Sequence, residues 1–204
     1  NEEALNEMQY LEKQFGYKVH YNKPISGKAD LEKLEKEYDA IFIGIGLGKT
    51  SSLNIKGEDL SGVTGAVEFV ERLRSGHHSV TVPDKVVVLG GGNTAMDAAS
   101  ESARLGADVI LAYRRSKEEM GAYDFEYDLA KSVGVKGMFN AAPLEIIGNG
   151  NVEAIRMIRT DNKANTIPGT EFTLECKMVI KATGQSKQTD FLSNISGLNT
   201  DNKG

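Results

Sequence analysis

One cysteine is all that the 204-residue sequence contains. A single thiol excludes an internal disulfide, a C-x-x-C redox pair and a cysteine-ligated iron–sulfur cluster within this chain. Such low cysteine usage is typical of proteins from a reducing compartment. We therefore expect a cytoplasmic location.

The sequence also lacks long apolar runs and blocks of basic residues. No apolar run approaches the ~20 residues that a membrane-spanning helix needs, and no secretory signal segment is expected at the N-terminus. The formal net charge is −5, with the positive charges spread along the chain. We therefore expect neither nucleic acid nor a membrane surface as a partner.

A starting methionine is missing as well, because the first residue is Asn1. Residues 1–15 follow an amphipathic helical pattern, with an apolar stripe from Leu5 to Phe15, and Gly16 then ends the helix. A helix of this kind is typical of the interior of a longer fold. We expect the sequence to be a piece of a larger protein.

The most informative stretch is residues 85–115, which begins with the apolar run 86–89. Such a run is typical of a parallel strand that is buried on both faces. The next residues read G-x-G-x-x-A and lead into a helix, which is the setting of a dinucleotide-binding fingerprint. Free amide groups and the dipole at the helix start favour phosphate binding. The residues expected to bind a cofactor here are Gly90, Gly91, Gly92, Asn93, Thr94 and Ala95.

The end of the next strand, residues 108–113, predicts which cofactor binds. An NAD-specific protein places an acidic residue there to bind the ribose 2′-OH. This sequence has Arg114 and Arg115 instead, while Asp108 stands at the opposite end of the strand. Arginine is a planar, permanently charged phosphate binder. We therefore predict NADP(H) rather than NAD(H), held through its 2′-phosphate.

The remaining pattern predicts an α/β fold in which the parallel sheet is joined by an antiparallel β-meander. Residues 38–46 read as another buried strand, 17–21 as a short strand, and 178–182 as the last central strand. The meander is expected at 144–147, 152–160 and 171–176, with a hairpin turn at 148–151. The result is a Rossmann-like NADP(H) domain with an added antiparallel sheet.

Several motifs, in this order and spacing, resemble one family. They are YDAIFIGIGLG (38–48), LNIKGEDLSGV (53–63), GGGNTAMD (90–97), YRRSKEEM (113–120) and VIKATGQ (179–185). They are similar to FAD- and NADPH-dependent oxidoreductases of the pyridine nucleotide-disulfide type. The branch they resemble comprises the glutamate synthase small subunit and the amino-terminal half of dihydropyrimidine dehydrogenase. The resemblance covers almost the whole chain.

That resemblance implies a domain plan. Residues 1–79 would be a segment of a partial second α/β domain of the FAD type, residues 80–186 the NADP(H)-binding domain, and residues 187–204 the start of the return to the FAD domain. Thr183 and Gly184 would then lie near the nicotinamide or pyrophosphate. The family's FAD fingerprint is missing from this sequence, so FAD is expected in the full-length protein but not in this fragment. The purified chain should then be colourless.

The sequence departs from the family pattern in two places. Residues 120–122 read Met-Gly-Ala where Met-Pro-Ala is usual. Residues 44–46 read Gly-Ile-Gly in place of an Ala-Thr-Gly-like pattern, although this variant occurs in the branch named above.

By resemblance, the function would be hydride passage from NADPH to flavin and on to a partner subunit or domain. The missing FAD half of the protein would be a partner too. The cofactors carry such chemistry, so no catalytic acid, base or nucleophile is predicted here. Three alternatives stay open: the corresponding part of a dihydropyrimidine dehydrogenase, a self-contained NADP-dependent dehydrogenase, and a non-catalytic nucleotide-binding or assembly module.

Other constellations carry weaker signals. Tyr127 and Lys131 match the Tyr-x-x-x-Lys pair of short-chain dehydrogenases, but the glycine loop of that family is lacking. His77 and His78 are adjacent and have no third ligand nearby, so no metal site is predicted. Cys176 has no activating base beside it and is expected to be a small buried residue.

Overall fold

The computed structural model describes residues 2–75 and 80–201. Internal contacts divide the chain into two units, Lys49–Ser186 and the pair of segments Asn1–Gly48 and Lys187–Gly204. The histidine pair at 77 and 78 lies outside the described residues. Every helix in the described part is too short or too polar to span a bilayer.

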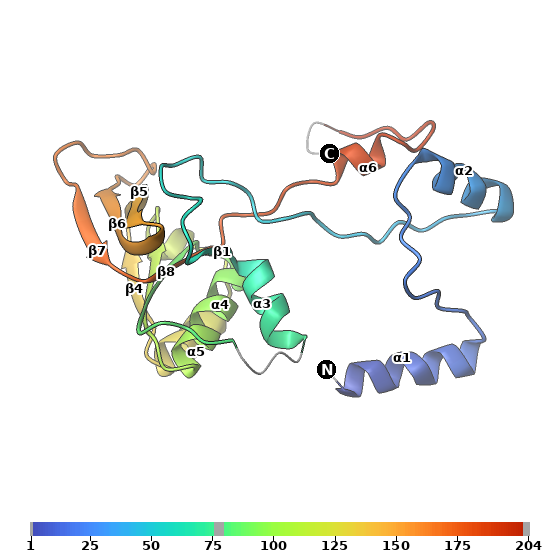
Figure 1. The fold of residues 1–204 in the computed structure, drawn as a ribbon, viewed down its shortest axis with the longest axis horizontal. Helices are drawn as coiled ribbons and strands as arrows, with labels where there is room; N and C mark the ends of the chain where they lie inside the picture. The colour runs from blue at the N-terminus through green and yellow to red at the C-terminus, as the bar shows by residue number, and fades with distance from the viewer. Residues whose placement is uncertain (1, 76–79, 202–204) are drawn as a thin grey trace. The chain divides into compact units, whose positions relative to one another are not determined.

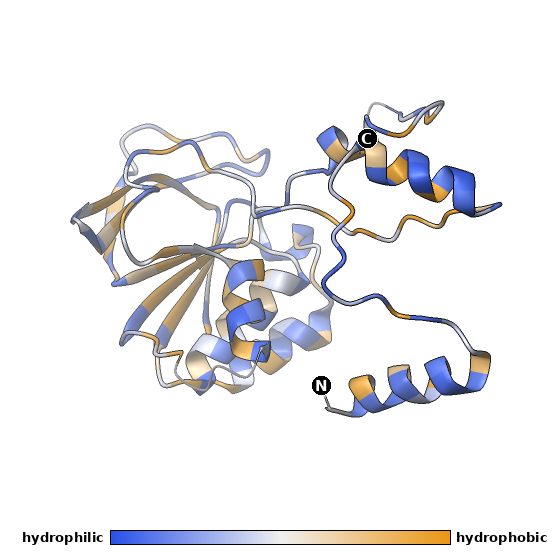
Figure 2. Cartoon of the chain, turned by 45° about the vertical axis from the view of Figure 1, so that its right-hand side comes forward, coloured by the Kyte–Doolittle hydropathy of each residue, from blue (hydrophilic) through white to orange (hydrophobic). Residues whose placement is uncertain are grey.

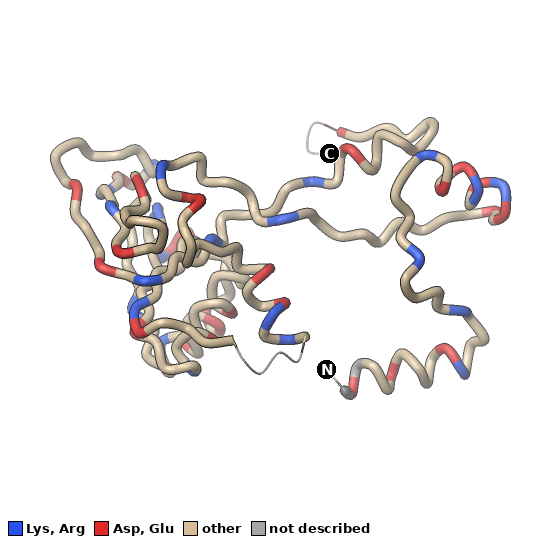
Figure 3. The backbone as a smooth tube through the Cα atoms, viewed as in Figure 1, with Lys and Arg blue, Asp and Glu red and all other residues tan. Residues whose placement is uncertain are grey.

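The unit made of residues 1–48 and 187–204 contains three helices, α1 (Glu2–Phe15), α2 (Lys28–Glu37) and α6 (Thr189–Leu192) (Figure 1). The predicted first helix is confirmed, and it ends at Gly16, whose φ is +70°. Charged residues of both signs follow one another along α2 (Figure 3), and Lys28 forms an i,i+4 ion pair with Glu32. This arrangement is typical of a solvated helix.

The strands predicted at 17–21 and 38–46 are wrong, because the structure has no strand in either segment. Phe42 is 96% exposed, and Ile41 and Ile45 are exposed as well. A parallel strand takes its backbone hydrogen bonds and its two apolar covers from neighbouring elements. The described part of this unit contains no strand that could supply them.

The unit Lys49–Ser186 is built on a five-stranded parallel sheet with the order β1-β8-β2-β3-β4. The strands are β1 (Val63–Gly65), β2 (Lys85–Leu89), β3 (Asp108–Tyr113), β4 (Lys136–Phe139) and β8 (Met178–Lys181). Three helices, α3 (Ala66–Arg74), α4 (Asn93–Arg104) and α5 (Asp124–Ser132), lie on one face of this sheet (Figure 1). The predicted unit of strand, helix and strand at 85–113 is confirmed.

A three-stranded antiparallel sheet covers the other face. It consists of β5 (Ala141–Asn149), β6 (Asn151–Arg159) and β7 (Phe172–Glu175). The predicted hairpin turn is confirmed, since Asn149 pairs with Asn151 around Gly150, whose φ is +80°. The predicted meander is therefore present, and its first strand begins three residues earlier than expected.

The parallel sheet separates two apolar cores. Along β2, Val86 and Val88 pack toward the helices, whereas Val87 and Leu89 pack toward the antiparallel sheet. The strands are accordingly apolar along most of their length (Figure 2). This two-sided burial explains why the run 86–89 does not alternate with polar residues.

The contact units share the limit predicted at residues 186/187, but their other limit lies at 48/49 rather than at the predicted 79/80. Residues 49–75 belong to the same unit as the parallel sheet, because β1 pairs with β8. The segments 49–51 and 184–186 run antiparallel, with Ser51 N donating to Gly184 O and Ser186 N to Lys49 O. Whether 1–79 is functionally an FAD-type segment stays a prediction.

Candidate functional site

The glycine turn follows β2 and leads directly into α4. Gly90 has a φ of +149°, and a Cβ there would collide with the backbone oxygen of Ala182. A Cβ on Gly91 would lie 2.6 Å from the ring of Tyr113. The protein itself therefore requires glycine at both positions, because strand and ring pack directly on the turn.

Gly92 differs from its two neighbours. Its φ of −104° is open to any residue, and a Cβ placed on it would meet no atom within 4 Å. It is the N-cap of α4, yet no side chain caps this helix start. Nothing in the described protein requires glycine here, whereas a group approaching the backbone from outside would.

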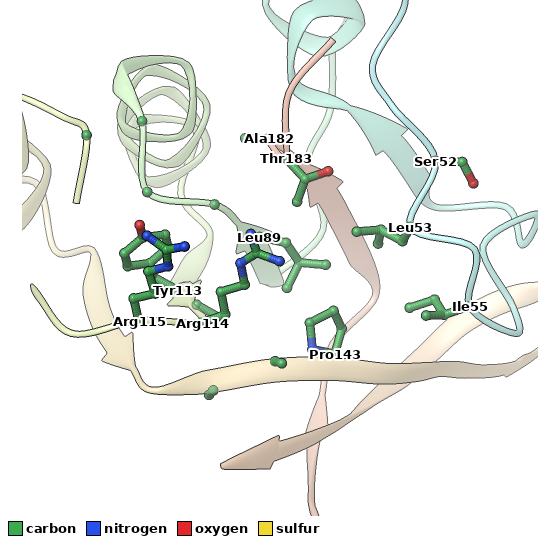
Figure 4. Close-up of a pocket in the computed structure, with 17 residues that line it drawn as sticks. Ser52, Leu53, Ile55, Leu89, Tyr113, Arg114, Arg115, Pro143, Ala182 and Thr183 are labelled. Atoms are coloured by element: carbon green, nitrogen blue, oxygen red, sulfur yellow. The ribbon is translucent and has the colours of Figure 1, made fainter. Parts of the chain in front are cut away.

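An open pocket of about 620 Å³ lies at this turn, where β8, β2 and β3 end (Figure 4). Six of the ten residues predicted to bind the cofactor line it, namely Gly90, Gly91, Gly92, Arg114, Arg115 and Thr183. The strand ends of a parallel sheet are the usual place for a ligand in α/β proteins.

The other four predicted residues do not line the pocket. Ala95 is fully buried, and its small side chain lies in the core beneath α4. Asn93 accepts a hydrogen bond from Tyr123 N, and Thr94 is exposed in the first turn of α4. Gly184 binds Ser51 through its carbonyl oxygen. These residues shape the turn and its surroundings.

Both arginines line the pocket, and Figure 4 shows Arg114 extending from the end of β3. Their backbone is fixed, because Thr160 Oγ1 donates to Arg114 O at 2.8 Å and Asn140 N donates to Arg115 O at 3.0 Å. The Arg115 guanidinium lies 4.0 Å from Glu119. Within the described part of the chain, the Arg114 guanidinium has no hydrogen-bond or ion-pair partner. Its backbone is therefore held, while its cation is unpaired among the described residues.

The loop that departs from the family pattern closes one side of the pocket. Ala122 N donates to Gly91 O at 3.0 Å, and Tyr113 OH donates to Glu119 O at 2.9 Å. Gly121 lines the pocket, and a Cβ on it would meet nothing within 4 Å. The glycine at this position leaves space beside the turn.

Sequence reasoning missed a second wall of the pocket. It comprises Ser52, Leu53 and Ile55 before β1, and Ala141, Ala142 and Pro143 at the start of β5. The stretch 53–63 was recognised as a motif, but nothing in its pattern places it beside the glycine turn. Ser51 brings it there by pairing with Gly184, a contact between residues distant in sequence.

One carboxylate holds the 52–55 part of this second wall in place. Glu58 accepts hydrogen bonds from Lys181 Nζ at 2.5 Å, Ser52 Oγ at 2.7 Å, and the backbone N–H groups of Leu53 and Asn54, each at 2.9 Å. Its side chain is only 15% exposed. Burial raises the pKa of Glu58, but the hydrogen bonds outweigh burial and lower that pKa to about 2.

The lowered pKa predicts a stability that depends on pH. We expect Glu58→Gln to reduce the free energy of unfolding near neutral pH by about 1–3 kcal/mol. The contribution of Glu58 is complete above the unfolded pKa of 4.5 and is lost as pH falls toward about 2. Urea unfolding of both proteins checks this, since their difference should shrink below about pH 4. An equal difference at every pH contradicts it.

The weaker constellations do not form sites. Tyr127 is 6% exposed and packs in the core on the helix side, where Lys131 Nζ lies 5.1 Å from its ring centroid. Cys176 is buried, as expected, and burial raises its pKa to about 12, so it stays a thiol. The described residues contain no cluster of three or more metal-binding side chains.

Residues 3–204 match the family model described as pyridine nucleotide-disulphide oxidoreductase. The chain belongs to this family. The sequence-based recognition is thereby confirmed, and so is the α/β fold class with its parallel and antiparallel sheets.

Two curated members of the family give the scale of the resemblance. The NADPH-Fe(3+) oxidoreductase subunit beta of Geobacter sulfurreducens is 32% identical over 198 residues, which cover 90% of this chain and 29% of that protein. The glutamate synthase [NADPH] small chain of Escherichia coli is 33% identical over 191 residues, covering 83% of this chain and 40% of that protein. The chain thus spans less than half of either relative.

A solved structure shares the fold. FprA of Mycobacterium tuberculosis in complex with NADPH superimposes with a TM-score of 0.59 and 21% sequence identity, covering 76% of this chain and 51% of that one. At this identity the likeness concerns the fold alone.

Proposed function

We propose that this chain is the NADP(H)-binding part of an FAD-dependent oxidoreductase. The observation that carries the proposal is Gly92, a glycine that opens onto a pocket and that no contact within the described protein explains. A diphosphate held against the backbone at this point would explain it. The diphosphate of the ligand would lie close to the backbone at the start of α4, where the helix dipole favours negative charge.

Arg114 and Arg115 support NADP(H) over NAD(H). Their guanidiniums would hold the 2′-phosphate of the adenosine ribose. In an NAD-specific protein, a carboxylate near this site would bind the ribose 2′-OH. The candidate here, Asp108, stands at the opposite end of β3 and pairs with Lys136 at 2.7 Å. The proposed specificity therefore follows from two cations in a pocket whose described lining residues include no carboxylate.

The proposal extends to the larger protein. NADPH supplies a hydride, which we propose passes to FAD and then to a partner subunit or domain, as in enzymes of the glutamate synthase small-subunit type. The names of the two relatives, a beta subunit and a small chain, support a multi-subunit setting. We propose Thr183, at the end of β8, as a contact for the pyrophosphate or nicotinamide, and a cytoplasmic location.

The remaining segments fit this plan. We propose that residues 1–79 and 187–204 contribute to a partial FAD-type domain. The exposed Ile41, Phe42 and Ile45 support this, because they form an apolar strand-like run for which a further sheet could provide neighbours. The missing FAD half of the protein would be that partner.

The rival of a self-contained dehydrogenase has less support. The described residues that line the pocket include no histidine, aspartate, glutamate, lysine or cysteine, and the hydroxyl of their one tyrosine, Tyr113, donates to Glu119 O. A dehydrogenase acting directly on a small substrate needs an acid–base group beside it.

Calorimetric titration of the chain tests the proposal. We expect NADPH to bind with a stoichiometry near one and at least about tenfold more tightly than NADH. Absence of binding for both nucleotides would refute the proposed function and would leave only an assembly role.

A further inference from the structure

The pocket has two distinguishable ends. In the sheet, β2 lies between β8 and β3, so the glycine turn after β2 stands in the middle. Arg114 and Arg115 follow β3 on one side, and Thr183 follows β8 on the other. If the arginines take the adenosine 2′-phosphate and the turn takes the diphosphate, the nicotinamide half must lie on the β8 side.

The wall of that side is the segment 52–55. Ser52, Leu53 and Ile55 line the pocket, and Leu53 and Ile55 also pack against the core beneath the antiparallel sheet. Asn54 has a φ of +55°, a conformation that L-residues seldom adopt without support from their surroundings. The segment therefore depends on interactions that hold it in this shape.

Glu58 supplies most of those interactions. Its carboxylate accepts hydrogen bonds from Ser52, Leu53 and Asn54, three consecutive residues of the wall. Through Lys181 it also ties the wall to the last residue of β8, two positions before Thr183. Both side chains of this ion pair are largely buried, with exposures of 15% for Glu58 and 13% for Lys181.

We propose that Glu58 is a positioning residue for the nicotinamide half of NADPH, acting through the 52–55 wall and the end of β8. This inference rests on the proposed function, because it needs NADPH in the pocket. Glu58 lies outside the group of residues that line the pocket, so it acts through Ser52, Leu53 and Lys181 rather than by touching the ligand.

The chemistry of the carboxylate makes the role specific. Every group that faces Glu58 in this network is a donor, and only an acceptor with two oxygens satisfies them all. A glutamine has the same shape but turns an NH₂ group toward one of these donors. Glu58→Gln should therefore disturb the wall while it leaves the arginine end of the pocket unchanged.

The test compares two ligands on the 204-residue chain. NADPH carries both halves, whereas adenosine 2′,5′-bisphosphate carries the 2′-phosphate and lacks the nicotinamide half. We expect Glu58→Gln to weaken NADPH binding about tenfold and to change the affinity for the bisphosphate less than about twofold. Glu175→Gln is the matched control, since it breaks an exposed carboxylate–lysine pair with Lys85 at the other end of the strands.

A second variant separates the two links that Glu58 makes. Lys181→Met keeps the three hydrogen bonds between Glu58 and the 52–55 wall and removes the link to β8. It should therefore weaken the binding of NADPH but not of the bisphosphate, and by less than Glu58→Gln does. The inference would be overturned if these variants lowered the affinity for both ligands equally. It would also be overturned if a folded Glu58→Gln protein bound NADPH with unchanged affinity. If the unmodified chain binds neither ligand, the proposed function itself fails, which is a different result.

Discussion

Replacing Arg114 with alanine should remove most of the preference for NADPH over NADH. The Arg114 guanidinium lines the pocket and has no partner within the described residues, while its backbone is held by Thr160. A charge-assisted hydrogen bond to a phosphate contributes about 1.5–3 kcal/mol, which corresponds to about tenfold to hundredfold in affinity. We expect the loss for NADPH alone, because NADH has no 2′-phosphate.

Calorimetric titration with each nucleotide measures the effect. Arg104→Ala is the matched control, because this arginine is in the last turn of α4 and pairs with Glu101 at 3.0 Å. It should leave both affinities unchanged. Arg115→Ala should cause a smaller loss than Arg114→Ala, since Glu119 already lies 4.0 Å from the Arg115 guanidinium. An equal loss of NADPH and NADH affinity in Arg114→Ala would contradict the assigned role.

The second large effect distinguishes two glycines of the same turn, Gly92 and Gly90, when each is replaced by alanine. Gly92→Ala should leave the fold intact and change the free energy of unfolding by less than about 1 kcal/mol. Alanine meets nothing in the folded chain, and its restriction of the unfolded chain is offset because alanine is a poorer N-cap than glycine. NADPH binding should nevertheless fall by at least about tenfold, since the new methyl group stands where the phosphate must approach.

Gly90→Ala should behave in the opposite way. Its Cβ would collide with the backbone of Ala182, and its φ of +149° is unfavourable for alanine, so we expect a destabilisation of about 2–4 kcal/mol. Urea unfolding and calorimetry on both variants check the pair of predictions. A Gly92→Ala protein that is stable and still binds NADPH with full affinity would remove the main support for the site.

Local signals predicted the central part of the fold well. The apolar run at 86–89, the glycines after it and the small residues of α4 all favour one unit of strand, turn and helix. Gly106 and Gly134, with φ values of +98° and +100°, follow α4 and α5 as the helix-ending pattern predicts. Each of these features depends on residues close together in sequence.

The features that the sequence did not predict correctly depend on contacts between residues that are far apart in the sequence. Residues 38–46 carry a strand-like sequence, but a strand forms only where neighbours complete its hydrogen bonds. Leu53 and Pro143 line the pocket because Ser51 pairs with Gly184 and β5 crosses below the strand ends. No periodicity in the sequence encodes such contacts.

The predicted residues line the pocket where the motif itself forms the surface. Gly92 and Arg114 stand at strand ends, which the order of strand and loop already fixes. Ala95 was included as the fingerprint residue that keeps helix and strand close, and it does pack in the core between α4 and the sheet. Glu58 was not predicted, because a carboxylate in a loop gives no sign of its partners before the fold brings Lys181 beside it.

The most direct test of the central claim is an amide NMR spectrum of the isotope-labelled chain, recorded with and without NADPH. The account predicts that the largest shifts fall on the backbone amides of Gly91, Gly92, Asn93 and Thr94 and on the guanidinium signals of Arg114 and Arg115. Shifts confined to other parts of the chain, or a spectrum that NADPH leaves unchanged, would contradict it.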